Sequence, residues 1–207
     1  MKMKIDLANK RHRDLHHLLM SAIVPRPIAW VSTISGDGVY NLAPFSSCCV
    51  VCMKPPMVGF AIGTTREGQR KDTLNNIKMT QDFVVNLVTE DLAEAMNITS
   101  ASYPPEVDEF KEAGLTAVPA DLVKSPMVVE SPVNLECRLY RVLEFGGERI
   151  TSGFVVGEIL RIHVNDELYV NEAIDMSKLK AIGRLGGGVG SDMYCRTTTS
   201  FVMGRPT

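Results

Sequence analysis

The residues best suited to binding a charged ligand lie together in residues 63–73, a segment that contains three threonines and three cations, Arg66, Arg70 and Lys71. Apolar residues then recur at helical spacing, which predicts a helix with Asp72 or Thr73 as its N-cap. Unpaired N–H groups at a helix start, with cations beside them, attract an anion such as a phosphate. The segment fits two interpretations, a site for a phosphate-bearing ligand and a solvated charged loop with an ordinary cap.

A second candidate segment is Asn41–Ser47, which reads Asn-Leu-Ala-Pro-Phe-Ser-Ser and lies between two strand-like runs. Small hydroxyl side chains and exposed backbone can hydrogen-bond the edge of a planar heterocycle, while Phe45 or Trp30 packs nearby. Taken alone, the segment fits an ordinary β-bend equally well.

The remaining reactive residue types predict no catalytic side chain and no metal site. Five cysteines are present. Cys49 and Cys52 form a Cys-x-x-Cys pair, which lies in an apolar run that begins at Cys48. A zinc site would need a second ligand pair, so we expect buried thiols rather than a redox or metal centre. On its apolar strand, His163 is expected to be a hydrogen-bonded core residue. The glycine-rich residues 183–190 do not follow a clear strand, so they do not predict a dinucleotide-binding loop.

The elements that would position these residues are mainly strands. Residues rich in β-branched and aromatic side chains predict strands at 28–34, 39–53, 57–62, 83–88, 133–145 and 154–164. Helices are expected near 71–80, 90–98 and 108–113, with an ordered excursion over 99–126 and a helical turn within 175–182. Long strands with interposed helices predict a mainly β fold, an antiparallel barrel of Greek-key type. We expect one domain over 1–207, with an N-terminal extension at 1–20 and a glycine-rich loop and tail at 183–207.

Composition excludes several classes of function. The 207 residues carry a formal net charge of -2, which argues against nucleic acid as a partner because phosphate backbones require a basic surface. No apolar run approaches the roughly 20 residues that span a bilayer, so no membrane association is expected. The first residues lack the apolar segment of a signal peptide, which makes the cytoplasm the expected location.

Several motifs together resemble one family. They are Pro25–Thr33 (PRPIAWVST), Asn41–Ser46 (NLAPFS), Lys71–Ile77 (KDTLNNI), Phe83–Leu87 (FVVNL), Asp108–Phe110 (DEF), Ala113–Thr116 (AGLT) and Gly183–Gly187 (GRLGG). Their order and spacing resemble the flavin reductase-like FMN-binding split-barrel family, and specifically its flavoredoxin branch. The resemblance extends from about Arg26 to Gly188.

This resemblance implies an FMN-binding oxidoreductase that works as a homodimer, with the flavin at the dimer interface. The phosphate would lie near Thr64, Arg66 and residues 71–73, and the isoalloxazine edge near Ser46 and Ser47. The full set of expected cofactor-binding residues is Ser32, Ser46, Ser47, Thr64, Arg66, Lys71, Asp72 and Thr73.

The resemblance also implies that FMN accepts electrons from NAD(P)H or from a redox protein and passes them to a second acceptor. Reductases of this family that use nicotinamide usually carry Gly-Asp-His on a late strand, whereas residues 153–158 here read Gly-Phe-Val-Val-Gly-Glu. A non-catalytic FMN electron carrier and a flavin-storage protein therefore remain as alternatives.

Overall fold

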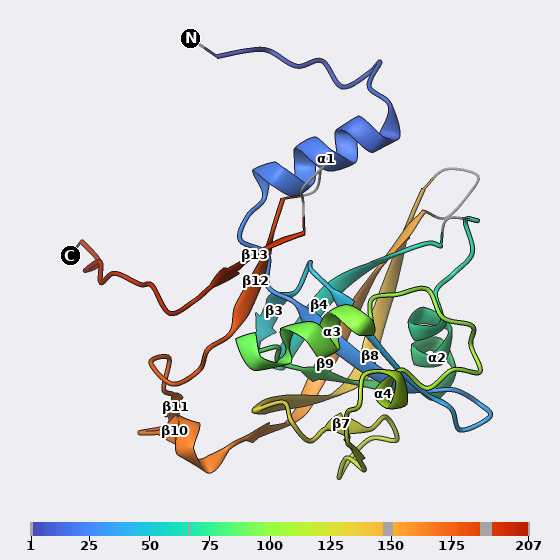
Figure 1. Ribbon diagram of the computed structural model, residues 1–207, viewed down its shortest axis with the longest axis vertical. Helices are drawn as coiled ribbons and strands as arrows, with labels where there is room; N and C mark the ends of the chain where they lie inside the picture. Colours follow the sequence, from blue (N-terminus) through green and yellow to red (C-terminus); the bar gives the residue numbers. More distant parts are fainter. Residues whose placement is uncertain (1, 66, 147–150, 187–191, 207) are drawn as a thin grey trace.

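The computed structural model describes residues 2–65, 67–146, 151–186 and 192–206. Its centre is an antiparallel sheet of seven strands in the order β2–β1–β5–β8–β9–β4–β3 (Figure 1). The strands are β1 Ala29–Ile34, β2 Tyr40–Phe45, β3 Cys49–Met53, β4 Pro56–Gly63, β5 Asp82–Asn86, β8 Val133–Phe145 and β9 Ser152–Val164. The expectation of a mainly β, antiparallel fold is confirmed.

The sheet is rolled into a barrel whose seam lies between β2 and β3. These strands occupy opposite edges of the sheet, yet only residues 46–48 separate them in the sequence. So short a link spans at most about 14 Å, which forces the two edges to approach each other. Across the interior, the ring of Phe45 on β2 packs against that of Phe60 on β4, with centroids 5.5 Å apart.

The barrel interior is filled by apolar side chains from alternate strand positions, and helix α2 (Asp72–Thr80) packs Leu74 and Ile77 against them. Gly157 on β9 leaves room for the ring of Phe83. A Cβ atom at position 157 would lie only 2.4 Å from Cζ of that ring. The packing of α2 on this core fixes the start of the helix relative to the barrel.

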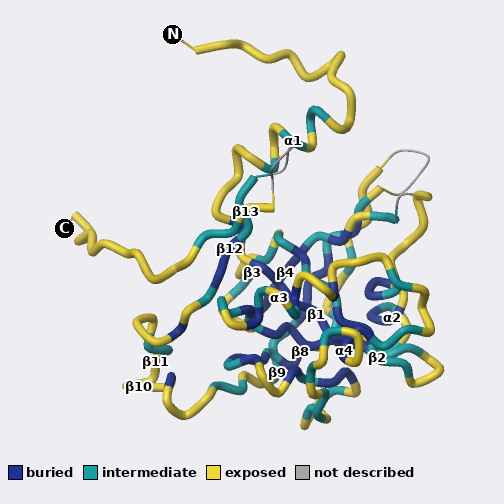
Figure 2. Tube along the Cα trace, viewed as in Figure 1, coloured by how far each residue is buried: buried dark blue, intermediate teal, exposed yellow. Residues whose placement is uncertain are grey.

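A second core lies outside the barrel wall. The wall strands are covered there by the short helices η1 (Glu90–Leu92), α3 (Ala93–Ile98) and α4 (Glu109–Glu112). Trp30 and Leu42 point outward from β1 and β2 and pack with Met96 and Phe110, whereas Val31 points inward. Both faces of β1 are therefore buried, as the dark central tube of Figure 2 shows.

The peripheral elements extend away from this body. Helix α1 (His12–Ala22) has no buried residue and projects from the barrel beside the hairpin of β12 (Ile182–Leu185) and β13 (Met193–Arg196) (Figure 1). The remaining short elements are β6 Ala117–Val118, β7 Met127–Val128, η2 Asp166–Leu168, β10 Tyr169–Val170 and β11 Ala173–Ile174. Among the described residues, no helix has both the length and the apolar character needed to span a membrane.

The structure corrects some boundaries. The run 39–53 is two strands on opposite edges of the sheet, and 175–182 contains a hydrogen-bonded turn followed by the start of β12. The N-cap of α2 is Lys71, rather than Asp72 or Thr73. The N-terminal extension contains α1, and the expected tail contributes β13, although residues 187–191 of the glycine-rich loop lie outside the described residues.

The cysteine run also differs from expectation. Its strand, β3, is an edge strand whose Val50 and Met53 are 71% and 79% exposed, and Cys49 is exposed as well. The prediction of buried thiols is therefore wrong for Cys49, and Cys48 and Cys52 are only half-buried, because an apolar run does not distinguish an interior strand from an edge strand. Cys137 on β8 is buried, and all five cysteines are free.

Candidate functional site

The start of helix α2 is an anion-attracting point. The N-cap residue Lys71 has extended backbone, with φ -70° and ψ 150°, and its own side chain makes no capping hydrogen bond. The N–H of Leu74 donates to the carbonyl of Lys71 at 3.0 Å, whereas the N–H groups of Asp72 and Thr73 have no acceptor among the described residues. The positive end of the helix dipole lies at these two groups.

Lys71 adds a positive charge at the same place. The residue as a whole is exposed, but its ammonium lies over the ring of Phe45, 5.6 Å from the centroid. Burial of this group lowers the pKa of Lys71. Within the described part of the chain, no carboxylate forms an ion pair with it. A cation in this position is available to an incoming anion.

A buried polar network fixes the first turn of α2 to the barrel wall. The hydroxyl of Thr73 donates to Oδ1 of Asn41 at 2.8 Å, and Nδ2 of Asn41 donates to Oε1 of Glu109 at 2.7 Å. The second carboxylate oxygen accepts from the backbone N–H of Leu42 at 3.1 Å. Burial raises the pKa of Glu109, against the opposing effect of these hydrogen bonds. The Thr73 hydroxyl therefore orients the helix rather than facing outward.

A groove begins at this point and continues along β2. Its narrow middle part, about 110 Å³, lies between Lys71 and residues 99–103, and its floor includes Asn41 and Pro44. At one end it meets a wide cleft of about 890 Å³, with which it shares Thr65 and Tyr103 among its lining residues. At the other end it meets a pocket of about 280 Å³, with which it shares Pro44 and Ser100 and which reaches Ser46.

The expected cofactor-binding residues are thus only partly brought together. Lys71, Asp72 and Thr73 line the middle of the groove, and Ser46 lines its far pocket. Thr64 pairs with Arg70 in an isolated bridge, and it is the next residue, Thr65, that lines the groove.

The other expected residues are placed differently. The hydroxyl of Ser47 donates to the carbonyl of Ala61 at 3.2 Å and accepts from its N–H at 2.9 Å, which ties the link between β2 and β3 to β4. Ser32 has no exposed surface, and its hydroxyl bonds to Pro126 and Asn86 in the outer core, so it does not reach the groove. Arg66 lies outside the described residues.

Sequence reasoning missed one wall of the groove. Residues 99–103, Thr-Ser-Ala-Ser-Tyr, follow α3 and line the middle part opposite Lys71. Their density of hydroxyl groups is the signal that could have identified them. Arg26 and Arg184 were also missed as lining residues of the far pocket, because nothing in their local sequence indicates that they meet.

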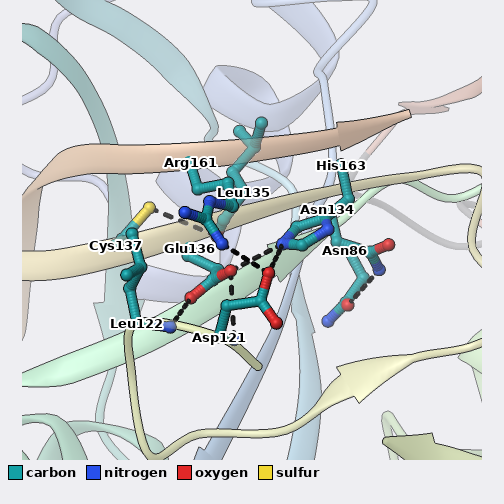
Figure 3. A network of polar contacts seen from close by, with 9 residues as sticks. All are labelled: Asn86, Asp121, Leu122, Asn134, Leu135, Glu136, Cys137, Arg161 and His163. Carbon is teal, nitrogen blue, oxygen red and sulfur yellow. Dashed lines mark hydrogen bonds and ion pairs between the residues drawn. The ribbon is translucent and has the colours of Figure 1, made fainter. Parts of the chain in front are cut away.

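A separate polar cluster lies on β8, β9 and the loop before β7 (Figure 3). Nε2 of His163 lies 2.6 Å from Oε1 of the fully buried Glu136, which also accepts from the backbone N–H groups of Asp121 and Leu122. Arg161 pairs with Asp121 at 2.5 Å. His163 is hydrogen-bonded as predicted, but it is only half-buried rather than a core residue.

This cluster closes the loop onto the barrel. Burial alone would raise the pKa of Glu136, but the hydrogen bonds from His163 and the two amides outweigh it, and the pKa of Glu136 is lowered. Oxygens of Glu136 and Asp121 already accept hydrogen bonds, and the guanidinium of Arg161 beside Asp121 would repel a metal cation. The arrangement is that of a structural ion-pair network.

Comparisons with known proteins agree on one family. Residues 20–177 match the family described as the flavin reductase-like domain. The crystal structure of nitrilotriacetate monooxygenase component B from Bacillus cereus is 31% identical, with a TM-score of 0.93 over 98% of this chain and 99% of that one. The 2-nitrobenzoate 2-nitroreductase NbaA from Pseudomonas fluorescens is 28% identical, with a TM-score of 0.87 over 99% and 97%. Flavoredoxin from Desulfovibrio vulgaris is 19% identical, with a TM-score of 0.74 over 98% and 97%, and shows the shared fold alone.

Proposed function

This chain belongs to the flavin reductase-like domain family, and we propose that it is an FMN-dependent oxidoreductase. It would take electrons from NAD(P)H or a redox protein and pass them to a second acceptor, as a homodimer in the cytoplasm. The observation that carries the proposal is the groove that leads from the start of α2, beside Lys71, to Ser46. Five free cysteines agree with a reducing compartment.

The residues present suit a flavin monophosphate. The N–H groups at the start of α2 and the ammonium of Lys71 would hold the phosphate, because a helix start and a lysine are a common anion-binding pair. Thr73 keeps those N–H groups in place through its bond to Asn41. When bound, FMN supplies the electron-accepting and electron-donating chemistry.

The rest of the groove would orient the ring. Pro44 and Ser46 lie on the side of β2, and residues 99–103 form the opposite wall of the middle part. This wall limits the access of water to a bound ring. Among the described residues that line these pockets, no nucleophile is hydrogen-bonded to a base, so positioning and electrostatics would be the contribution of the protein.

The experiment that tests the proposal is identification of the ligand. The purified protein should take up about one FMN per chain in a titration followed by flavin absorbance, and heat should release it unchanged. Light scattering at micromolar concentration should give the dimer mass. Uptake of FAD in place of FMN, or of no flavin, would contradict the cofactor assignment.

A second candidate, an electron carrier reduced only by another protein, is favoured by residues 153–158. The segment lacks the Gly-Asp-His triplet that the family resemblance associates with nicotinamide docking. It lies within β9, paired with β4 and β8, where Val155 and Val156 are buried. Anaerobic addition of NADPH and NADH to the FMN-loaded protein separates the two functions. Bleaching of the flavin absorbance indicates a reductase, whereas an unchanged spectrum that a reduced redox protein bleaches indicates a carrier.

A further inference from the structure

Two arginines from distant parts of the chain meet at the far pocket of the groove. Arg26 precedes β1 and Arg184 belongs to β12, and they pair as an antiparallel bridge. The backbone N–H of Arg26 donates to the carbonyl of Arg184 at 3.0 Å, and the N–H of Arg184 donates back at 2.9 Å. Residues paired in this way direct their side chains to the same side, with Cβ atoms roughly 5 Å apart.

The guanidinium of Arg26 is held without a counter-ion. The residue is 6% exposed, and its donors bond to the carbonyls of Met20, Ile23 and Gly186 and weakly to Oγ of Ser46. These acceptors are neutral, and no acidic residue in the described ranges forms an ion pair with Arg26. Burial and the nearby charge of Arg184 lower the pKa of Arg26.

Within the described part of the chain, the charge of Arg184 is compensated at the surface. Its guanidinium lies 4.6 Å from the ring centroid of Tyr194 and 3.2 Å from the carboxylate of Asp192. The Asp192 side chain is 95% exposed, where an ion pair contributes little. Two cations therefore line one pocket, and among the described carboxylates only the exposed Asp192 pairs with either of them, which favours the binding of an anion there.

Both arginines line the pocket of about 280 Å³ that also contains Ser46 and His16. We propose that this pocket binds the carboxylate of a small organic acid, which is the second substrate of the protein. Paired guanidinium groups match the planar, two-oxygen geometry of a carboxylate. The volume lies at the lower end of the range of ligand pockets, about 300–1,000 Å³, which suits a compact aromatic or aliphatic acid.

The pocket lies next to the proposed flavin site. It joins the middle part of the groove at Pro44 and Ser100, and that middle part is itself lined by Lys71, where the phosphate is proposed to bind. The inference rests on the proposed function in one respect, namely that a flavin ring lies in the groove between the two charged points. An acid held by the arginines would then lie beside the ring.

The test uses benzoate and its neutral analogue benzamide. Calorimetric titration of the FMN-loaded protein should show benzoate binding at least about tenfold tighter than benzamide. Arg184→Gln should reduce benzoate affinity to the level of benzamide. The matched control is Arg138→Gln, which removes an exposed arginine paired with Glu158 at 2.8 Å on the sheet, and it should leave benzoate affinity unchanged. A melting curve should show that both variants remain folded.

Three results would overturn the inference. The first is equal binding, or no binding, of benzoate and benzamide. The second is tighter binding of inorganic phosphate than of benzoate. The third is a loss of FMN affinity in Arg184→Gln as large as its loss of benzoate affinity, because the arginines would then hold the cofactor. The same titrations on flavin-free protein measure benzoate binding to the pocket independently of FMN. Failure to bind FMN would therefore contradict the proposed function alone.

Discussion

Replacement of Lys71 by methionine should separate ligand binding from stability. Methionine keeps a long, flexible side chain but removes the ammonium over Phe45. That ammonium has no ion-pair partner in the described part of the chain, and its burial is unfavourable, as the lowered pKa of Lys71 indicates. The variant should therefore lose FMN affinity without losing stability.

The two effects have different sizes. A charge-assisted hydrogen bond to a phosphate contributes about 1.5–3 kcal/mol, which corresponds to a dissociation constant roughly 10- to 150-fold higher in Lys71→Met. In the flavin-free protein, the variant loses a cation–π contact of about 0.5–1 kcal/mol and gains from the removal of an unfavourable burial. These terms oppose each other, so the free energy of unfolding should change by less than about 1 kcal/mol.

The measurements are a titration followed by quenching of FMN fluorescence and urea unfolding of the flavin-free protein. Lys78→Met is the matched control, because Lys78 lies on the same helix but pairs with Glu144 near its other end. The control should bind FMN as the wild type does. Equal FMN affinity in Lys71→Met and the wild type would show that the start of α2 is not the phosphate site.

Three further changes have defined outcomes. Gly157→Ala should lower the free energy of unfolding by about 1–3 kcal/mol, because the added Cβ would meet the ring of Phe83. The control Gly63→Ala, with open space around it, should not. Equal melting temperatures of the two variants would refute this prediction. Glu136→Gln should destabilise by about 1–3 kcal/mol at pH 7 through its lost hydrogen bonds. Because folding lowers the pKa of Glu136, its ionised carboxylate stabilises the fold above its ordinary pKa of 4.5, and this stabilisation is lost as the pH falls through the lowered pKa. Urea unfolding at pH 3 should therefore show a smaller difference between the variant and the wild type. Simultaneous replacement of Cys48, Cys49 and Cys52 by serine should leave flavin reduction and reoxidation nearly unchanged. Burial raises the pKa of Cys48 to about 11 and disfavours its thiolate. Loss of electron transfer in a folded, FMN-loaded variant would show that the thiols take part.

Much of the fold could be predicted because its strands have local signatures. The alternation of Leu135, Cys137 and Leu139 with polar residues gives the bounds of β8, and the structure has the same bounds, Val133–Phe145. The exposed side of β3 could not be predicted, because its composition is that of a buried strand. Exposure depends on which edge of the sheet the strand occupies, and that is set by long-range pairing.

In the candidate site, too, local features could be predicted from the sequence and long-range contacts could not. The cationic segment before α2 is continuous in sequence, so its chemistry is visible without a structure. Ser32 was expected to bind the cofactor because it lies in a family motif, but the alternation of a strand does not say which of the two cores a side chain enters. The pairing of Arg26 with Arg184 joins the beginning of the barrel to a hairpin near the end of the chain, and no local pattern predicts such a contact.

The order in which the strands pair has a consequence during synthesis. Strand β4, which leads into the 63–71 segment, pairs with β3 and with β9, and its partners on β9 are made about 90 to 100 residues later. At the usual elongation rate of about 5–20 residues per second, that delay is roughly 5–20 s. During this interval β4 has only the short β3 beside it, and its other edge is open to pairing with a neighbouring chain. The nascent chain should therefore depend on ribosome-associated chaperones until β9 emerges, and truncation before Ser152 should give an aggregating product rather than a smaller flavin-binding unit.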